Sequence, residues 1–145
     1  MDYFLDTNII IILFEGRDSE IKNKVKDILT NNNNSFYAST ISILEMAQLY
    51  KKKRINNINY ESEEFNTGDK FISYILNELP ILKILPFEEK HALIASRLSF
   101  VKNHNDPNDL AIIAHAIGEK MFLISCDDKF PLYKEQGASI IHNSR

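Results

Sequence analysis

Carboxylate side chains recur in this 145-residue sequence where short apolar runs end or helical patterns begin. Asp6 directly follows an apolar run near the amino terminus, and the pair Asp127-Asp128 follows another one late in the chain. Glu45 lies within one helical pattern, and Asp109 lies in the first turn of another. Carboxylates that pack together repel one another, and hard divalent cations such as Mg²⁺ or Mn²⁺ relieve this repulsion. The pattern therefore predicts a site for one or two such ions, which can activate water for phosphodiester hydrolysis.

These acids also have purely structural interpretations. An aspartate at a strand end can simply form a turn, and a glutamate within a helix is usually solvated. We favour metal binding for Asp6, which lies between an apolar strand and an Ile-rich helix, and for Glu45, which apolar neighbours crowd. Asp106 before Pro107 is typical of a helix N-cap, whereas Asp109 fits a capping box and a metal ligand equally well.

The elements that must position these acids alternate between apolar strands and helical patterns. Strands separated by helices predict parallel pairing with right-handed crossovers, hence an α/β fold whose sheet of about five strands has helices on both faces. The chain length favours a single domain over residues 1–145. Because ligands bind at the carboxyl ends of such strands, we expect Asp6, Glu45, Asp109 and Asp127 to converge there. The predicted strands are 3–5, 35–39, 81–85, 121–124 and 138–141.

Three further segments carry specific predictions. Asp18 or Ser19 can cap a second helix, and apolar spacing after Pro86 predicts a long helix that continues through Val101 until the polar stretch 103–105 ends it. The segment 51–68 is basic, then Asn-rich, then acidic. With little apolar surface to bury, it is the connection that we expect to be the most mobile.

Composition narrows the possible functions. A formal net charge of −3 gives no general basic field for nucleic acid, although acids no longer outnumber basic residues once the four candidate ligands are set aside. One cysteine, Cys126, and no signal peptide favour the cytoplasm, and the apolar run 9–14 is far shorter than the ~20 residues of a membrane span. The four histidines lack zinc-ligand spacing, and neither a glycine-rich phosphate loop nor a G-x-S-x-G nucleophile motif occurs.

Four short motifs follow one another along almost the whole chain. They are Phe4-Leu5-Asp6-Thr7-Asn8, Ser42-Ile43-Leu44-Glu45, Asn108-Asp109-Leu110-Ala111-Ile112-Ile113-Ala114-His115-Ala116 and Leu123-Ile124-Ser125-Cys126-Asp127-Asp128-Lys129-Phe130. In this order the motifs resemble those of PIN-domain nucleases. The size of the chain also resembles that of the VapC toxins, which are small PIN-domain ribonucleases of toxin–antitoxin pairs.

The resemblance implies an endoribonuclease that depends on Mg²⁺ or Mn²⁺, acts on RNA, is held inactive by a cognate antitoxin and is commonly a homodimer. Asn8 matches the family's polar residue after the first acid, and Ser125 stands where the family usually has threonine. Asp127 is favoured over Asp128 as the fourth acid by its spacing to the following phenylalanine. The acidic quartet carried over from the family is Asp6, Glu45, Asp109 and Asp127.

Other classes of protein compete with this interpretation. A receiver domain needs a phosphorylated aspartate after the third strand, where the run 81–86 has none, and a haloacid-dehalogenase-type phosphatase needs a second aspartate where Asn8 stands. The strongest alternative is a catalytically silent PIN-like scaffold that acts through protein contacts. The basic run 51–54 is best explained as a helix end, and it could also contact an RNA backbone. The residues around 12–14 are best explained as core, and could also form a dimer or antitoxin face.

Overall fold

Five parallel strands form the sheet of the computed structural model, which describes residues 1–145. Each strand coincides with a predicted one to within two residues at either end, and the predicted single-domain α/β fold is confirmed. The strands are β1 (Asp2–Leu5), β2 (Ser35–Ser39), β3 (Leu82–Leu85), β4 (Phe122–Ser125) and β5 (Ile140–His142).

The strand order β3-β2-β1-β4-β5 sets the position of the site. From β1 the chain moves outward to β2 and β3, and it then returns to place β4 on the other side of β1. The direction of winding therefore reverses between β1 and β4, the point at which open α/β sheets bind their ligands. Asp6 lies directly at this switch point, where its backbone N–H donates to the carbonyl oxygen of Ile124 at 3.0 Å.

The sheet is apolar on both faces because alternate side chains of its central strands enter two different cores. In β1, Tyr3 and Leu5 enter one core and Phe4 enters the other, and in β4 Ile124 and Leu123 divide in the same way. This pattern is typical of a parallel sheet covered on both sides. It confirms the prediction of helices on both faces.

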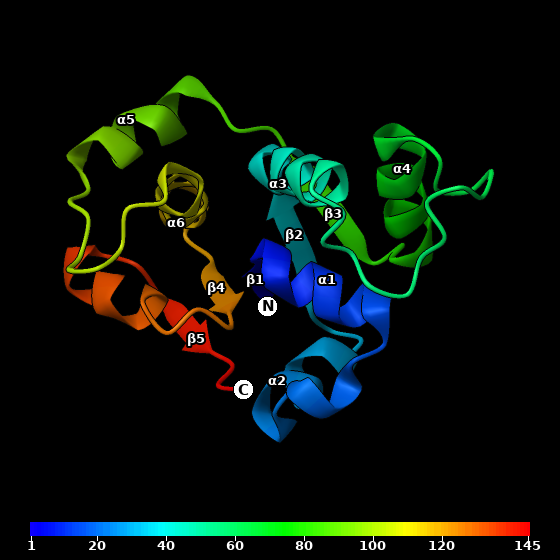
Figure 1. The fold of residues 1–145 in the computed structure, drawn as a ribbon. Helices are drawn as coiled ribbons and strands as arrows, with labels where there is room; N and C mark the ends of the chain where they lie inside the picture. The colour runs from blue at the N-terminus through cyan, green and yellow to red at the C-terminus, as the bar shows by residue number, and fades with distance from the viewer.

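The helices form two layers around the sheet (Figure 1). Helices α1 to α4 contribute to the core that contains Leu5, whereas α6 and the 3₁₀ segment η2 contribute to the core that contains Phe4, with α5 packed on α6. None of these helices is long and apolar enough to cross a bilayer. Their bounds are α1 (Thr7–Glu15), α2 (Asn23–Thr30), α3 (Thr40–Lys51), α4 (Gly68–Glu78), α5 (Glu89–Arg97), α6 (Pro107–Glu119), η1 (Asp18–Glu20) and η2 (Phe130–Gln136).

The prediction that the second helix begins at Asp18 or Ser19 is wrong. Residues 18–20 form only the single turn η1, and α2 begins at Asn23. Contacts with the end of the chain explain the interruption, since Asn143 accepts from the backbone N–H of Lys22 at 2.8 Å and donates to the carbonyl oxygen of Glu20 at 2.8 Å.

The predicted long helix through Val101 is also wrong, because α5 ends at Arg97. Beyond it, side chains of η2 replace helical hydrogen bonds: Gln136 accepts from the N–H of Ser99 at 2.8 Å, and the hydroxyl of Tyr133 accepts from that of Val101 at 3.2 Å. The segment 98–106 is thereby held across η2.

The segment 51–68 buries more apolar surface than its composition suggests. Ile55 is buried, and Tyr60 and Phe65 pack against the core that contains α4. The hydroxyl of Tyr50 donates to the carbonyl oxygen of Phe65, which ties the segment to α3. The expectation of little burial there is wrong, because a few well-spaced aromatic residues are enough to anchor it.

Candidate functional site

Asp6 is the N-cap of α1 and is only 3% exposed. Its Oδ1 accepts from the backbone N–H of Thr7 at 2.7 Å, and its Oδ2 accepts from the hydroxyl of Ser125 at 2.7 Å. Burial raises the pKa of Asp6 well above its usual value, the hydrogen bond from Ser125 opposes this, and the charges of Asp109 and Glu45 raise it further. The carboxylate is thus held in place by donors but is poorly neutralised.

Glu45 projects from α3 toward Asp6 and is held there by Thr7. The hydroxyl of Thr7 donates to Oε1 of Glu45 at 2.6 Å and lies 2.8 Å from the hydroxyl of Ser42. The hydroxyl of Thr7 has a single proton, and it donates this proton in the hydrogen bond to Glu45. In the contact between the two hydroxyls, Ser42 is therefore the donor and Thr7 the acceptor. Burial raises the pKa of Glu45, the Thr7 hydrogen bond lowers it, and the charge of Asp106 raises it again.

Asp109 lies in the first turn of α6, where Asp106 serves as the N-cap and accepts from the N–H of Asn108 at 2.9 Å. The structural interpretation of Asp106 is therefore confirmed. Asp109 forms no capping box with it, and its Oδ2 instead accepts from Nε2 of His104 at 2.9 Å. Burial, followed by the charges of Asp106, Glu45 and Asp127, raises the pKa of Asp109 to about 8.

Asp127 follows β4 in a turn that is closed by hydrogen bonds. Its N–H donates to the hydroxyl of Ser125 at 3.0 Å, and its Oδ1 accepts from the N–H of Lys129 at 2.8 Å. Asn8 connects α1 to the same turn, since its Oδ1 accepts from the N–H of Cys126 at 3.2 Å. Ser125 and Asn8 thus bring the ends of β1 and β4 together around the acids.

The structure brings the predicted acids into two overlapping groups. One ligand atom each from Asp6, Glu45 and Asp109 lie within 4.8 Å of one another, and the same holds for His104, Asp109 and Asp127. Asp109 belongs to both groups. One buried and several half-buried carboxylates this close together are unfavourable as free anions. Their oxygen atoms are the ligands that Mg²⁺ and Mn²⁺ prefer, so the residues fit such an ion.

The remaining predicted candidates lie differently. The side chain of Asp128 is 88% exposed and contacts Nε2 of His142 at 3.1 Å, outside both groups. Asp106 lines a cavity of about 220 Å³ beside Glu45, together with Lys52 and Arg54. This cavity joins part of the acidic site to two cations that follow α3.

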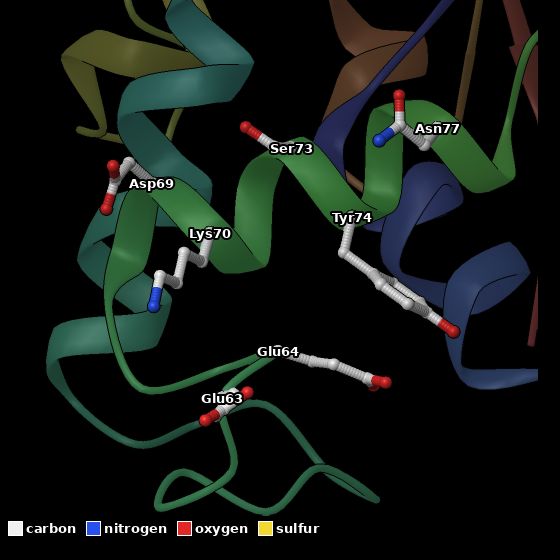
Figure 2. Close-up of a pocket in the computed structure, with 7 residues that line it drawn as sticks. All are labelled: Glu63, Glu64, Asp69, Lys70, Ser73, Tyr74 and Asn77. Carbon is white, nitrogen blue, oxygen red and sulfur yellow. The ribbon is translucent and has the colours of Figure 1, made fainter.

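A hollow of about 300 Å³ between α4 and the preceding segment is separate from the acids of the site. Figure 2 shows Glu63 and Glu64 on the segment, facing Lys70 and Tyr74 on the helix. None of its lining residues belongs to either carboxylate group. It is an open, charged surface feature that lies apart from the acids at the carboxyl ends of the strands.

Two residues that contact the acids have no functional role predicted from the sequence. Thr7 occurs only within the first of the four motifs, and His104 only within the polar stretch 103–105 that was expected to end a helix. The position of Thr7 between Asp6 and Asn8 could have predicted its contact with the acids. The first residue of a helix that directly follows an acid at a strand end lies at the same edge of the sheet as that acid. No local pattern places His104, which reaches Asp109 through the segment that crosses η2.

Comparison with known proteins gives a consistent result. The family model of the PIN domain matches residues 3–136. The chain is 30% identical over 129 residues to Ribonuclease VapC2 of Haemophilus influenzae strain Rd. The matched residues make up 86% of this chain and 86% of that relative.

Solved structures share the fold at low sequence identity. VapBC-1 from nontypeable Haemophilus influenzae has a TM-score of 0.65 at 22% identity, and DNA-bound VapBC from Salmonella typhimurium has 0.66 at 14%. VapBC2 from Rickettsia felis, bound to a promoter DNA fragment, has 0.64 at 21%. Each match covers 98% of both chains. The match over residues 3–136 and the shared fold show that the chain belongs to the PIN-domain family.

Proposed function

We propose that the protein is an endoribonuclease that depends on Mg²⁺ or Mn²⁺ and is the toxin of a type II toxin–antitoxin pair. One observation carries the proposal: Asp6, Glu45 and Asp109, from three distant segments, meet at the switch point of the sheet with ligand atoms within 4.8 Å. The name of the Haemophilus relative supports ribonuclease activity, and the VapBC complexes support a cognate antitoxin as partner. A cytoplasmic location and a homodimer belong to the same proposal.

In this proposal the four acids Asp6, Glu45, Asp109 and Asp127 hold the ion or ions. A divalent cation held by these acids would supply an activated water and positive charge beside the phosphate. The chain itself contributes no nucleophile. Ser125 orients Asp6 through its hydroxyl, which preserves the chemistry of the threonine expected at that position.

The cations beside the site suit an RNA backbone. Lys52 and Arg54 line the cavity next to Glu45, where they can contact backbone phosphates of a bound RNA. Contacts of this kind position the substrate without reading its sequence. They also explain how a chain with a net charge of −3 accepts a polyanion.

Cleavage of RNA by the purified protein tests the proposal. We expect cleavage with Mg²⁺ or Mn²⁺, none in excess chelator, and restoration when the cation is added back. Asp6→Asn, which keeps the shape but removes the charge, should be inactive, whereas Asp128→Asn should match the unmodified protein because Asp128 lies outside the cluster. Equal cleavage by Asp6→Asn, or cleavage in chelator, would refute the metal mechanism. A protein that binds no divalent cation and cuts no RNA would instead be the silent scaffold.

A further inference from the structure

His104 is buried between η2 and the start of α6, and it contacts one of the proposed metal ligands. The residue is only 8% exposed, and Nε2 of its ring lies 2.9 Å from Oδ2 of Asp109. On the opposite side of the ring, Nδ1 forms a short hydrogen bond with the hydroxyl of Tyr133. The imidazole therefore connects a buried tyrosine to an acid of the site.

The hydrogen bonds around Tyr133 determine which ring nitrogen carries the proton. The hydroxyl oxygen accepts from the backbone N–H of Val101 at 3.2 Å, so it retains one proton to donate. The acceptor in contact with that hydroxyl is Nδ1 of His104. A neutral imidazole that accepts at Nδ1 carries its proton on Nε2, and this N–H points at the Asp109 carboxylate.

The ring has little freedom to leave this position. Tyr133 is fully buried, and the aromatic ring of Phe130 lies edge-on to the imidazole with centroids 6.2 Å apart. The segment that carries His104 is fixed by Ser99, whose N–H and carbonyl oxygen both bond to the Gln136 side chain. These contacts are also the ones that end α5 early.

We propose that His104 is a positioning residue for the metal site: its Nε2–H holds one oxygen of Asp109 and so presents the carboxylate to a cation shared with Asp6 and Glu45. This role rests on the proposed function, because it requires the acids to bind metal. Hydrogen bonds to ligating carboxylates set their orientation, and their loss typically lowers metal affinity 10- to 100-fold. Although His104 lies in the second acidic group, a nitrogen that donates its proton to Asp109 is not itself a ligand.

Two substitutions of His104 distinguish the hydrogen bond of Nε2 to Asp109 from that of Nδ1 to Tyr133. The amide of His104→Gln reaches about as far as Nε2 and can still donate to Asp109, whereas that of His104→Asn reaches only as far as Nδ1 and can bond to Tyr133 alone. Tyr133→Phe leaves the imidazole in place but removes the hydroxyl that selects its tautomer. Thermal unfolding of all three variants controls for loss of fold, and Tyr133→Phe provides an independent test if either His104 variant fails to fold.

The experiment measures Mn²⁺ affinity by calorimetry, RNA cleavage, and the tautomer of His104 by nitrogen-15 NMR of the unmodified protein. We expect a proton on Nε2 and a 10- to 100-fold loss of Mn²⁺ affinity in His104→Asn. We expect affinity within a few-fold of normal in His104→Gln, and a lower kcat with unchanged KM for RNA in His104→Asn. The loss in Tyr133→Phe should be intermediate.

The possible failures are distinguishable. If the unmodified protein binds Mn²⁺ and cuts RNA, but His104→Asn does both equally well, the role of His104 is wrong and the proposed function stands. If NMR shows an unprotonated Nε2 that shifts when a diamagnetic ion such as Mg²⁺ is added, His104 is a ligand and the positioning role is also wrong. If the unmodified protein binds no Mn²⁺, the proposed function is overturned and the role of His104 with it.

Discussion

Replacing Asp109 with asparagine should stabilise the metal-free protein while it abolishes activity. Burial and three neighbouring acids raise the pKa of Asp109 to about 8 in the folded state, against an unfolded value of 3.8. The folded protein therefore holds this proton more tightly than the unfolded chain does. Stability due to this group is greatest below pH 3.8 and falls as the pH rises toward 8.

The size of the effect follows from the separation of the two pKa values. A pH of 7.5 is almost four units above the pKa of the carboxyl in the unfolded chain, where the group is fully ionised. In the folded protein the same carboxyl is still largely protonated at this pH. At about 1.36 kcal/mol per unit, ionisation of this carboxyl in the unfolded chain, which the folded state resists, lowers the free energy of unfolding by up to about 5 kcal/mol. Asparagine has no such penalty, so Asp109→Asn should be the more stable protein at pH 7.5, by at most this amount.

Chemical denaturation in chelator, followed at pH 4 and pH 7.5, measures this difference. The advantage of Asp109→Asn should be large at pH 7.5 and shrink to below about 1 kcal/mol at pH 4, where the penalty is nearly absent. Adding Mg²⁺ at 100 times its Kd should restore about 2.7 kcal/mol to the unmodified protein and nothing to the variant. An Asp109→Asn protein that is less stable than the unmodified one at pH 7.5, or an advantage that does not change with pH, would refute the reasoning.

Three further outcomes follow from the structure. Burial, reinforced by the charge of a second histidine, lowers the pKa of His115 from 6.5 to about 4. The free energy of unfolding should therefore fall by about 3 kcal/mol as the pH drops from 6.5 to 4. Chemical denaturation at a series of pH values should show that His115→Asn lacks this pH dependence. Asp127→Asn should slow RNA cleavage by about a hundredfold and Asp128→Asn should not, and equal effects would contradict the assignment of the fourth acid. Changing Lys52 and Arg54 together to alanine should weaken RNA binding and reduce its logarithmic salt dependence by about 0.7 per cation, and an unchanged slope would exclude them from the RNA surface.

The sequence was sufficient to predict the sheet and the convergence of its acids, for a physical reason. Parallel strands buried on both faces are short uninterrupted apolar runs, and their carboxyl ends share one edge, so Asp6 and Asp127 could be placed without knowing any contact. Glu45 and Asp109 required only the next step, because Glu45 lies in the second turn of the helix that follows β2 and Asp109 lies in the first turn of the helix that precedes β4.

What the sequence did not reveal depends on contacts between distant segments. The early end of α5 and the late start of α2 arise because Gln136, Tyr133 and Asn143 take backbone hydrogen bonds that a helix would otherwise use. Local periodicity contains no record of such competition. The contact between His104 and Asp109 is a consequence of the same arrangement, and therefore became visible only in the fold.

Calorimetric titration with Mn²⁺ tests the central claim, that acids from four segments form one cation site, most directly. The unmodified protein should bind one or two ions, and Asp6→Asn should lose measurable binding, because Asp6 is the most deeply buried acid of the site and bonds to both Thr7 and Ser125. Undiminished binding by Asp6→Asn, or no binding by the unmodified protein, would contradict the account.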